Sequence, residues 1–190
     1  MARRFVSFAI FALVMTSAGA SAQVAREPLS LGALDNGVYR NSLTGVEFNL
    51  PADWVIVNEG RSSSGAGSQY VTLRDTTTNE IGTVWLKARA VNAADLPALL
   101  SRRLDSKAAQ RNNFEGYKYR DGSEHQFEVS GKPALSAIAD YVRNGRQMSE
   151  YITWVDGEKS RVVFGARMET AALAGFQSRF DQIIQSAVVP

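Results

Sequence analysis

The 190-residue sequence contains no cysteine and only one histidine, His125. Disulfides, a cysteine nucleophile and lipid attachment through cysteine are therefore excluded, and so are zinc sites built from several histidines. The chain also lacks a Gly-x-Ser-x-Gly nucleophile elbow, and its Gly- and Ser-rich segment 60–68 lacks the Lys-Ser/Thr pair of a phosphate-binding loop. From these absences we expect no catalytic residue, no metal and no cofactor, and hence a protein that is not an enzyme.

Residues 1–22 have the three parts of a bacterial export signal. Arg3 and Arg4 give a positive start, and residues 5–15 form an apolar core that is too short to span a bilayer. The small residues of Ala20-Ser21-Ala22 then offer a signal-peptidase site, with cleavage expected after Ala22. We therefore expect a periplasmic or secreted protein that does not span the membrane once the signal is removed.

Removal of the signal changes the charge of the chain. The full sequence has 21 Lys and Arg against 19 Asp and Glu, and the loss of Arg3 and Arg4 leaves 19 of each. A neutral mature chain gives no basic surface for nucleic acid, so we expect no nucleic-acid partner. The expected partner is an unidentified envelope protein or a small ligand.

The remaining chain divides into a flexible lead-in at 23–36 and one domain at 37–190. Segment 60–68 is the one low-complexity stretch and predicts a mobile loop. Short segments rich in β-branched and aromatic residues, bounded by turn residues, predict strands. They are Val38–Arg40, Val46–Leu50, Trp54–Val57, Gln69–Arg74, Ile81–Arg89, Phe114–Arg120, Glu124–Ser130, Ala134–Arg143, Gln147–Val155 and Lys159–Met168.

Two helices complete the expected fold. The first covers about 95–112, where Asp95 is a suitable N-cap and leucines recur at helical spacing. The second covers about 170–187, with Thr170 as its expected cap and large apolar residues on one face. Because strands and helices do not alternate strictly, we expect an α+β domain, with two helices packed on a mainly antiparallel sheet of about 7–9 strands.

The beginning of this domain carries a family resemblance. The pattern Tyr39-x-Asn41-x-x-x-Gly45-x-x-Phe48-x-Leu50-Pro51-x-x-Trp54 resembles the opening of PsbP-like domains, the fold of a photosystem extrinsic subunit and its bacterial relatives. The order of elements is also similar over roughly residues 37–189. The resemblance implies that the Leu-Pro-x-x-Trp segment is mainly a packing element. It further implies a non-catalytic binding or accessory domain, and no metal-binding residue is carried over.

One group of polar residues stands out within the predicted sheet. Asn144-Gly145 is a strong hairpin signal that pairs Arg143 with Arg146 and so places Ala139 opposite Glu150. A tight connection at 131–133 would put His125 beside Ala139, and a three-residue loop at 156–158 would put Phe164 on the same face. The expected row across the sheet is Tyr119, His125, Ala139, Glu150 and Phe164.

Three interpretations of this row remain open. The histidine and carboxylate are structural, or they line a ligand pocket with Tyr119 and Arg103, or Glu150 is the acid or base of a hydrolase. The first helix offers partners for Glu150, since Arg103, Lys107 and Arg111 fall on the same side as its leucines. These side chains either extend outward into solvent or reach the Glu150 row. A binding site for anionic envelope components is a further reading of the basic side chains on this helix.

A second candidate face involves aromatic residues. If Arg74 pairs with Ile81 across the Thr-Thr-Thr-Asn turn, Tyr70 lies opposite Trp85 beside the loop at 60–68. Such a pair would suit a sugar ligand, whereas a core or cross-strand role is the alternative.

We therefore expect an exported, non-enzymatic accessory or binding module of the bacterial cell envelope. The alternative is a small-molecule or glycan-binding domain that uses the Glu150/His125 row or the Tyr70/Trp85 face.

Overall fold

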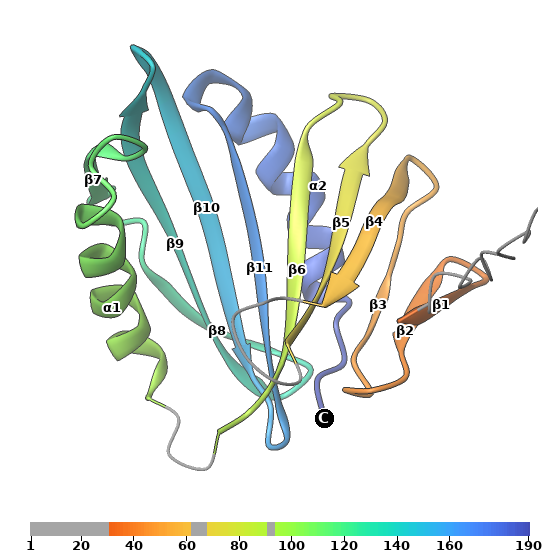
Figure 1. Ribbon diagram of the computed structural model, residues 1–190. Coiled ribbons are helices and arrows are strands. Elements are labelled where there is room, and N and C mark those ends of the chain that lie inside the picture. Colours follow the sequence, from red (N-terminus) through yellow and green to blue (C-terminus); the bar gives the residue numbers. More distant parts are fainter. Residues whose placement is uncertain (1–30, 62–67, 91–93) are drawn as a thin grey trace, which may run out of the picture.

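The computed structural model describes residues 31–61, 68–90 and 94–190. The expected signal at 1–22, most of the lead-in and the core of the 60–68 loop lie outside these residues. Two α-helices, one short 3-10 helix and eleven strands make up the described chain (Figure 1). They are β1 (Gly32–Asp35), β2 (Val38–Asn41), β3 (Glu47–Asn49), β4 (Trp54–Arg61), β5 (Ser68–Asp75), β6 (Ile81–Ala88), α1 (Leu96–Ala108), β7 (Glu115–Tyr119), β8 (His125–Val129), β9 (Lys132–Arg143), β10 (Arg146–Asp156), β11 (Ser160–Glu169), η1 (Thr170–Ala172) and α2 (Leu173–Gln185).

The strands form two antiparallel sheets. The small sheet has the order β1-β2-β3, and the large sheet runs β4-β5-β6-β11-β10-β9-β7. Strand β8 also pairs with β9, but at residues 132–136, whereas β7 pairs with the later part of β9 at 139–142. The expected α+β class with a mainly antiparallel sheet and two packed helices is confirmed.

The two helices cover opposite faces of the large sheet (Figure 1). Helix α2 and the small sheet pack on one face, where Phe176 and Phe180 are fully buried with Phe164 and Phe48. Helix α1 packs on the other face near β7 and β9 and buries Leu96 and Leu100. Among the described elements, no helix packs on the α1-side face over β4, β5 and β6 (Figure 1).

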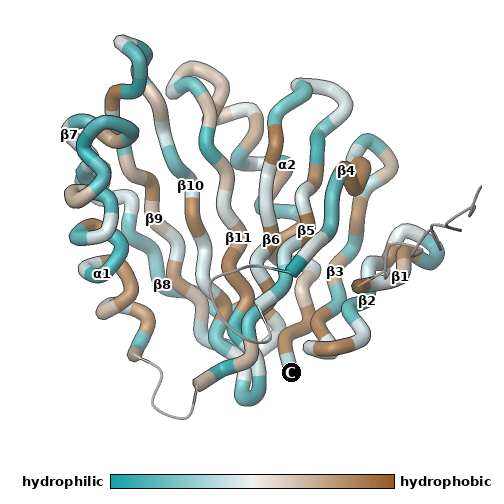
Figure 2. Tube along the Cα trace, viewed as in Figure 1, coloured by the Kyte–Doolittle hydropathy of each residue, from teal (hydrophilic) through white to brown (hydrophobic). Residues whose placement is uncertain are grey.

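Local sequence explains several of these elements. Asn144 and Gly145 adopt φ values of 52° and 75°, as a two-residue hairpin turn requires, and the predicted Arg143–Arg146 pair forms. The Asp95 side chain accepts a hydrogen bond from the Ala98 amide and so caps α1. Figure 2 shows hydrophobic residues recurring along β9, β10 and β11, whereas the hairpin joining β9 to β10 is hydrophilic.

Three local expectations need correction. Part of the lead-in is structured, because Gly32–Asp35 pairs with Val38–Asn41 through a turn at Asn36 and Gly37, both at positive φ. The first helix ends at Ala108 rather than near 112, and turns follow it. Thr170 does not cap the second helix, because it begins η1, whose N-cap is Glu169 with no side-chain hydrogen bond.

Candidate binding groove on the α1 side of the sheet

A carboxylate, that of Glu150, lies beneath α1 and accepts hydrogen bonds at both of its oxygens. Glu150 on β10 is 1% exposed and accepts two hydrogen bonds from Arg103 on α1, Nε to Oε2 at 2.8 Å and Nη2 to Oε1 at 2.6 Å. Tyr117 on β7 donates its hydroxyl to Oε2 at 2.7 Å, and Arg167 on β11 donates to Oε1. One carboxylate therefore joins a helix to three strands of the sheet.

These donors control the charge of Glu150. Burial is the largest single influence and acts to raise its pKa. The hydrogen bonds and charge of Arg103, followed by the charge of Arg167, together outweigh burial and lower the pKa to about 2. Glu150 is therefore a carboxylate at neutral pH. Burial and the neighbouring Glu150 raise the pKa of Tyr117, so its hydroxyl stays protonated as a donor.

A third cation, Lys107, lies in the same region. Lys107 is buried, and its Nζ lies 4.0 Å from the centroid of the Phe114 ring. Burial, together with the positive charges of Arg167 and Arg103 and against a raising effect from Glu150, lowers its pKa to about 8. The positive charge around Glu150 thus exceeds what one carboxylate neutralises.

Three adjoining cavities follow β6 on this face. A cavity of about 200 Å³ is bordered by Thr83, Trp85 and Arg167, and a second of about 210 Å³ shares Trp85 and Arg167 with it. The second also shares Lys87 with a third cavity of about 260 Å³ near the beginning of α1. We call this row of cavities the β6 groove. It exists because alternate residues of β6 point to this uncovered face of the sheet.

The walls of the β6 groove are strongly cationic. Its six basic wall residues are Lys87, Arg89, Arg102, Arg103, Arg161 and Arg167. Their carboxylate partners in the described structure are Glu150, which binds Arg103 and Arg167, and Asp156, which binds Arg89 and Arg161. Burial lowers the pKa of Lys87, and the charges of Arg103 and Arg161 add to this effect. The groove therefore carries excess positive charge around Trp85.

Three of the predicted site residues do come together. Tyr119 lies opposite Ala139, which lies opposite Glu150, and Arg103 reaches this row from α1 as one interpretation expected. The Tyr119 hydroxyl donates to the Leu100 carbonyl at 3.0 Å and so also holds α1 against the sheet. Arg111 is exposed and lies away from the row.

The predicted position of His125 is wrong. The β8–β9 turn is Ser130-Gly131, with φ values of 49° and 72°, rather than a connection at 131–133. His125 consequently pairs with Ser136, and this odd shift in register turns it to the α2 side of the sheet. His125 and Glu150 therefore lie on opposite faces.

The predicted phase of β11 is also wrong. Glu150 lies opposite Arg167, whereas Phe164 pairs with Thr153 and points to the α2 core. Arg167 was missed because residues 160–166 are all buried, so apolar alternation gives no phase for this strand. Tyr117, which donates its hydroxyl to Glu150, was not among the predicted site residues. The available signal was the charge of Arg167, which follows the buried residues 160–166 within the same strand.

The predicted register of Tyr70 and Trp85 is confirmed, and the two residues are Cα partners on the α1-side face. Their rings nevertheless lean apart. Tyr70 lies over Gly60 of β4, and Trp85 lies over Gly165 of β11, where an added Cβ would come within 2.8 Å of its ring. Trp85 lines the β6 groove and Tyr70 does not line its cavities.

Within residues 31–61, 68–90 and 94–190, no three His, Cys, Asp or Glu side chains gather as a metal ion would require. In that same part of the chain, no helix has the length and apolar character needed to cross a membrane.

Comparison with solved structures identifies the architecture. Cyanobacterial PsbP (CyanoP) from Synechocystis sp. PCC 6803 superposes with a TM-score of 0.58 at 14% identity, covering 86% of this chain and 98% of that one. The fold is PsbP-like. LpqN of Mycobacterium tuberculosis, described as involved in cell envelope biogenesis, gives a TM-score of 0.50 at 15% identity, covering 76% of this chain and 83% of that chain. No family model matches the sequence, and no curated protein matches it.

In this PsbP-like fold, the residues that carried the resemblance are packing elements. Tyr39 stacks on Phe48 with ring centroids 4.8 Å apart, and Trp54 stacks on Phe180 at 5.7 Å. The Asn41 side chain accepts hydrogen bonds from the backbone amides of residues 43 and 44 and so shapes the turn after β2. The motif therefore joins the small sheet and α2 to the main sheet, away from the β6 groove.

Proposed function

We propose that this protein is an exported, non-enzymatic binding module of the bacterial cell envelope, and that its β6 groove binds an extended anionic glycan. The observation that carries the proposal is the charge of the groove. Six basic side chains line the groove, and two carboxylates partner them within the described residues. Three of the six, Lys87, Arg103 and Arg167, line the same cavities as Trp85. Such excess positive charge favours carboxylate or phosphate groups, and the partly exposed indole ring of Trp85 suits the flat face of a sugar.

The shape of the groove supports an elongated ligand. From Ile81 to Arg89, the residues along β6 span about 26 Å at roughly 3.3 Å per residue. Positive side chains occur at both ends and in the middle of this length, whereas Trp85 occupies the centre. A chain of several acidic sugar units would place its charges along the groove.

A binding role is favoured over hydrolysis by the state of Glu150. Its pKa of about 2 leaves it a weak base and an unavailable acid at neutral pH. Both carboxylate oxygens already accept hydrogen bonds from protein donors. We therefore assign Glu150 to holding α1 and to orienting Arg103 and Arg167 along the groove.

The proposal of export rests on the sequence of residues 1–22. The proposal of an envelope role rests also on a protein of similar fold. LpqN, whose fold is similar, is described as involved in cell envelope biogenesis. Fractionation and mass spectrometry of the mature protein test export directly. We expect a periplasmic or secreted chain that begins at Gln23, and retention of residues 1–22 on a cytoplasmic protein would contradict it.

Calorimetry with oligogalacturonate, an acidic sugar chain, tests the groove. Lys87 and Arg102 are the residues to change, because neither forms an ion pair within the described structure and their removal leaves no acid unpaired. The double variant Lys87→Gln, Arg102→Gln should lower affinity by about tenfold and weaken its dependence on salt. Neutral dextran should bind at least tenfold more weakly than oligogalacturonate.

Arg111→Gln is the matched control, since it removes an exposed arginine next to α1 but outside the groove. It should leave affinity unchanged. Equal binding of dextran and oligogalacturonate, or full affinity in the double variant, would refute the anionic-glycan proposal.

A further inference from the structure

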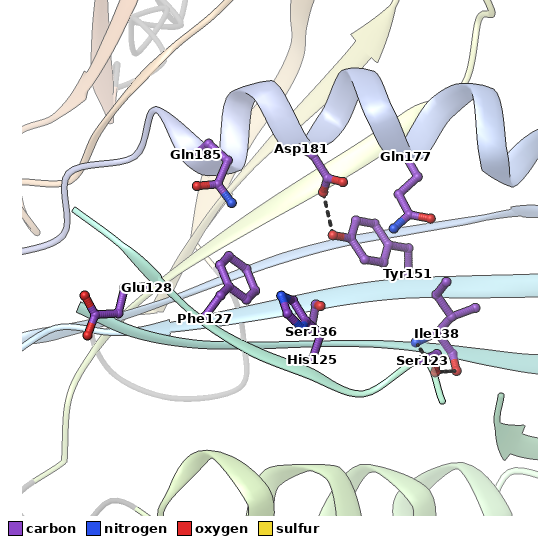
Figure 3. Close-up of a pocket in the computed structure, with 10 residues that line it drawn as sticks. All are labelled: Ser123, His125, Phe127, Glu128, Ser136, Ile138, Tyr151, Gln177, Asp181 and Gln185. Atoms are coloured by element: carbon purple, nitrogen blue, oxygen red, sulfur yellow. Dashed lines mark hydrogen bonds between the residues drawn. The ribbon is translucent and has the colours of Figure 1, made fainter. Parts of the chain in front are cut away.

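A separate cavity lies on the other side of the large sheet. It measures about 510 Å³ and opens between α2 and strands β8, β9 and β10 (Figure 3). Phe127, Ile138 and the ring of Tyr151 supply its apolar walls, and His125 stacks on Phe127 with ring centroids 5.5 Å apart. It shares no wall residue with the β6 groove.

Helix α2 contributes a polar stripe to this cavity. Gln177, Asp181 and Gln185 recur every four residues and therefore project from one side of the helix. Figure 3 shows all three extending toward the sheet, above Tyr151 and Phe127. The apolar face of α2 is a different one, so these polar residues are not required by the core.

The cavity is acidic. Its ten wall residues include Asp181 and Glu128 but neither Lys nor Arg, and His125 is the one residue among them with a titratable nitrogen. Asp181 accepts a hydrogen bond of 2.5 Å from the buried Tyr151 hydroxyl, and within the described chain it forms no ion pair. Burial raises the pKa of Asp181 and outweighs the opposite effect of the Tyr151 hydrogen bond. A half-buried carboxylate thus lacks the cation that would stabilise its charge.

The chemistry of these walls selects among ligands. An anion would be repelled by Asp181 and Glu128. A neutral sugar would leave the carboxylate of Asp181 without a cation. An alkylammonium ion would suit these walls, because its charge would pair with Asp181 and its methylene groups would contact the aromatic rings. The side-chain oxygens of Gln177 and Gln185 would offer acceptors for its remaining N–H groups.

We infer that the cavity between α2 and β8 is a binding site for small organic ammonium ions, with Asp181 as the residue that pairs with the cation. The inference is independent of the proposed function of the β6 groove, because it concerns the opposite face of the sheet.

Calorimetry with putrescine, a linear diamine, tests the site in the mature protein. Putrescine should bind, and 1,4-butanediol, which has the same four-carbon chain but no charge, should bind at least tenfold more weakly. Asp181→Asn keeps the side-chain shape and an acceptor for Tyr151, and should lower putrescine affinity by about tenfold or more. Asp121→Asn, at an exposed turn outside the cavity, is the matched control and should leave affinity unchanged.

A second variant keeps the inference testable if Asp181→Asn does not fold. Gln177→Lys places a cation one helical turn from Asp181 and should abolish putrescine binding while Asp181 remains in place. Magnetisation transfer between the putrescine methylene protons and the Phe127 ring would locate the ligand. Absence of putrescine binding, equal binding of butanediol, or full affinity in Asp181→Asn would each overturn the inference.

Discussion

Glu150 and Arg103 lie 47 positions apart in the chain and form a two-bond ion pair, at 2.8 and 2.6 Å, that joins β10 to α1. Tyr117 and Arg167 complete the set of donors to the carboxylate. Because α1 buries little besides Leu96, Leu100 and Lys107, this ion pair is a large part of what holds the helix against the sheet. The same pair also orients Arg103 in the wall of the β6 groove.

Replacing Glu150 with Ala should lower the free energy of unfolding by about 3–5 kcal/mol. The reason is that Arg103, whose side chain is only 21% exposed, would lose its counter-ion, and the buried Tyr117 hydroxyl would lose its acceptor. Removal of one partner of a buried pair is strongly destabilising. Urea denaturation measures the change. Glu124→Ala, at an exposed position, is the control and should stay within about 0.5 kcal/mol of the wild type. Equal stability of the two variants would show that the ion pair does not hold α1.

The stability of the protein should fall in acid because of Glu150. Its pKa is lowered from the ordinary value of 4.5 to about 2 in the folded state, so the unfolded chain binds the proton first. The resulting contribution, about 3 kcal/mol, is fully present above pH 4.5 and is lost as pH falls toward 2. Unfolding free energies measured across this range should show a smaller slope in Glu150→Gln. An unchanged slope in that variant would contradict the assignment.

Lys107 should release its proton near pH 8, below the ordinary lysine value of 10.5. Since the unfolded chain keeps this proton longer, Lys107 should make stability rise with pH between about 8 and 10.5. Nuclear magnetic resonance of the lysine side chain follows the titration. Arg167→Gln should raise the midpoint, because Arg167 is the charge that lowers this pKa most, whereas the exposed Arg146→Gln should not. A midpoint near 10.5 in the unaltered protein would refute this prediction.

Gly165→Ala should disturb the β6 groove through Trp85. A Cβ at this position would lie 2.8 Å from the Trp85 ring, so the ring must move. We expect a loss of stability of about 1–3 kcal/mol, a shifted Trp85 indole resonance and weaker oligogalacturonate binding. Gly175→Ala on α2 is the control, because an added Cβ meets nothing within 4 Å there. It should preserve binding and stabilise the helix by up to about 1 kcal/mol. Normal binding in Gly165→Ala would show that the position of Trp85 does not matter.

Much of the fold could be predicted from local patterns. The strand from Gln69 to Arg74 and the one from Ile81 onward form with the expected register, because the turn between them leaves little choice of pairing. Asn144-Gly145 likewise determined that Glu150 faces Ala139. Asp95 and the leucines that follow it were sufficient to place the beginning of α1. In each case, residues that are close in the sequence determine the strand register or the beginning of the helix.

The candidate sites depended on longer-range information. The turn between β8 and β9 lies at Ser130-Gly131 rather than at 131–133. His125 therefore lies on the same face as Asp181, opposite to the face of Glu150. The loop between β10 and β11 differs from the three-residue loop predicted at 156–158. Arg167, rather than Phe164, therefore lies opposite Glu150. The sequence by itself determined the strands, the helices and the hairpin registers fixed by tight turns. Only the tertiary structure decided which side chains share a face, because strands buried on both sides show no alternation and an odd shift in register reverses every side chain.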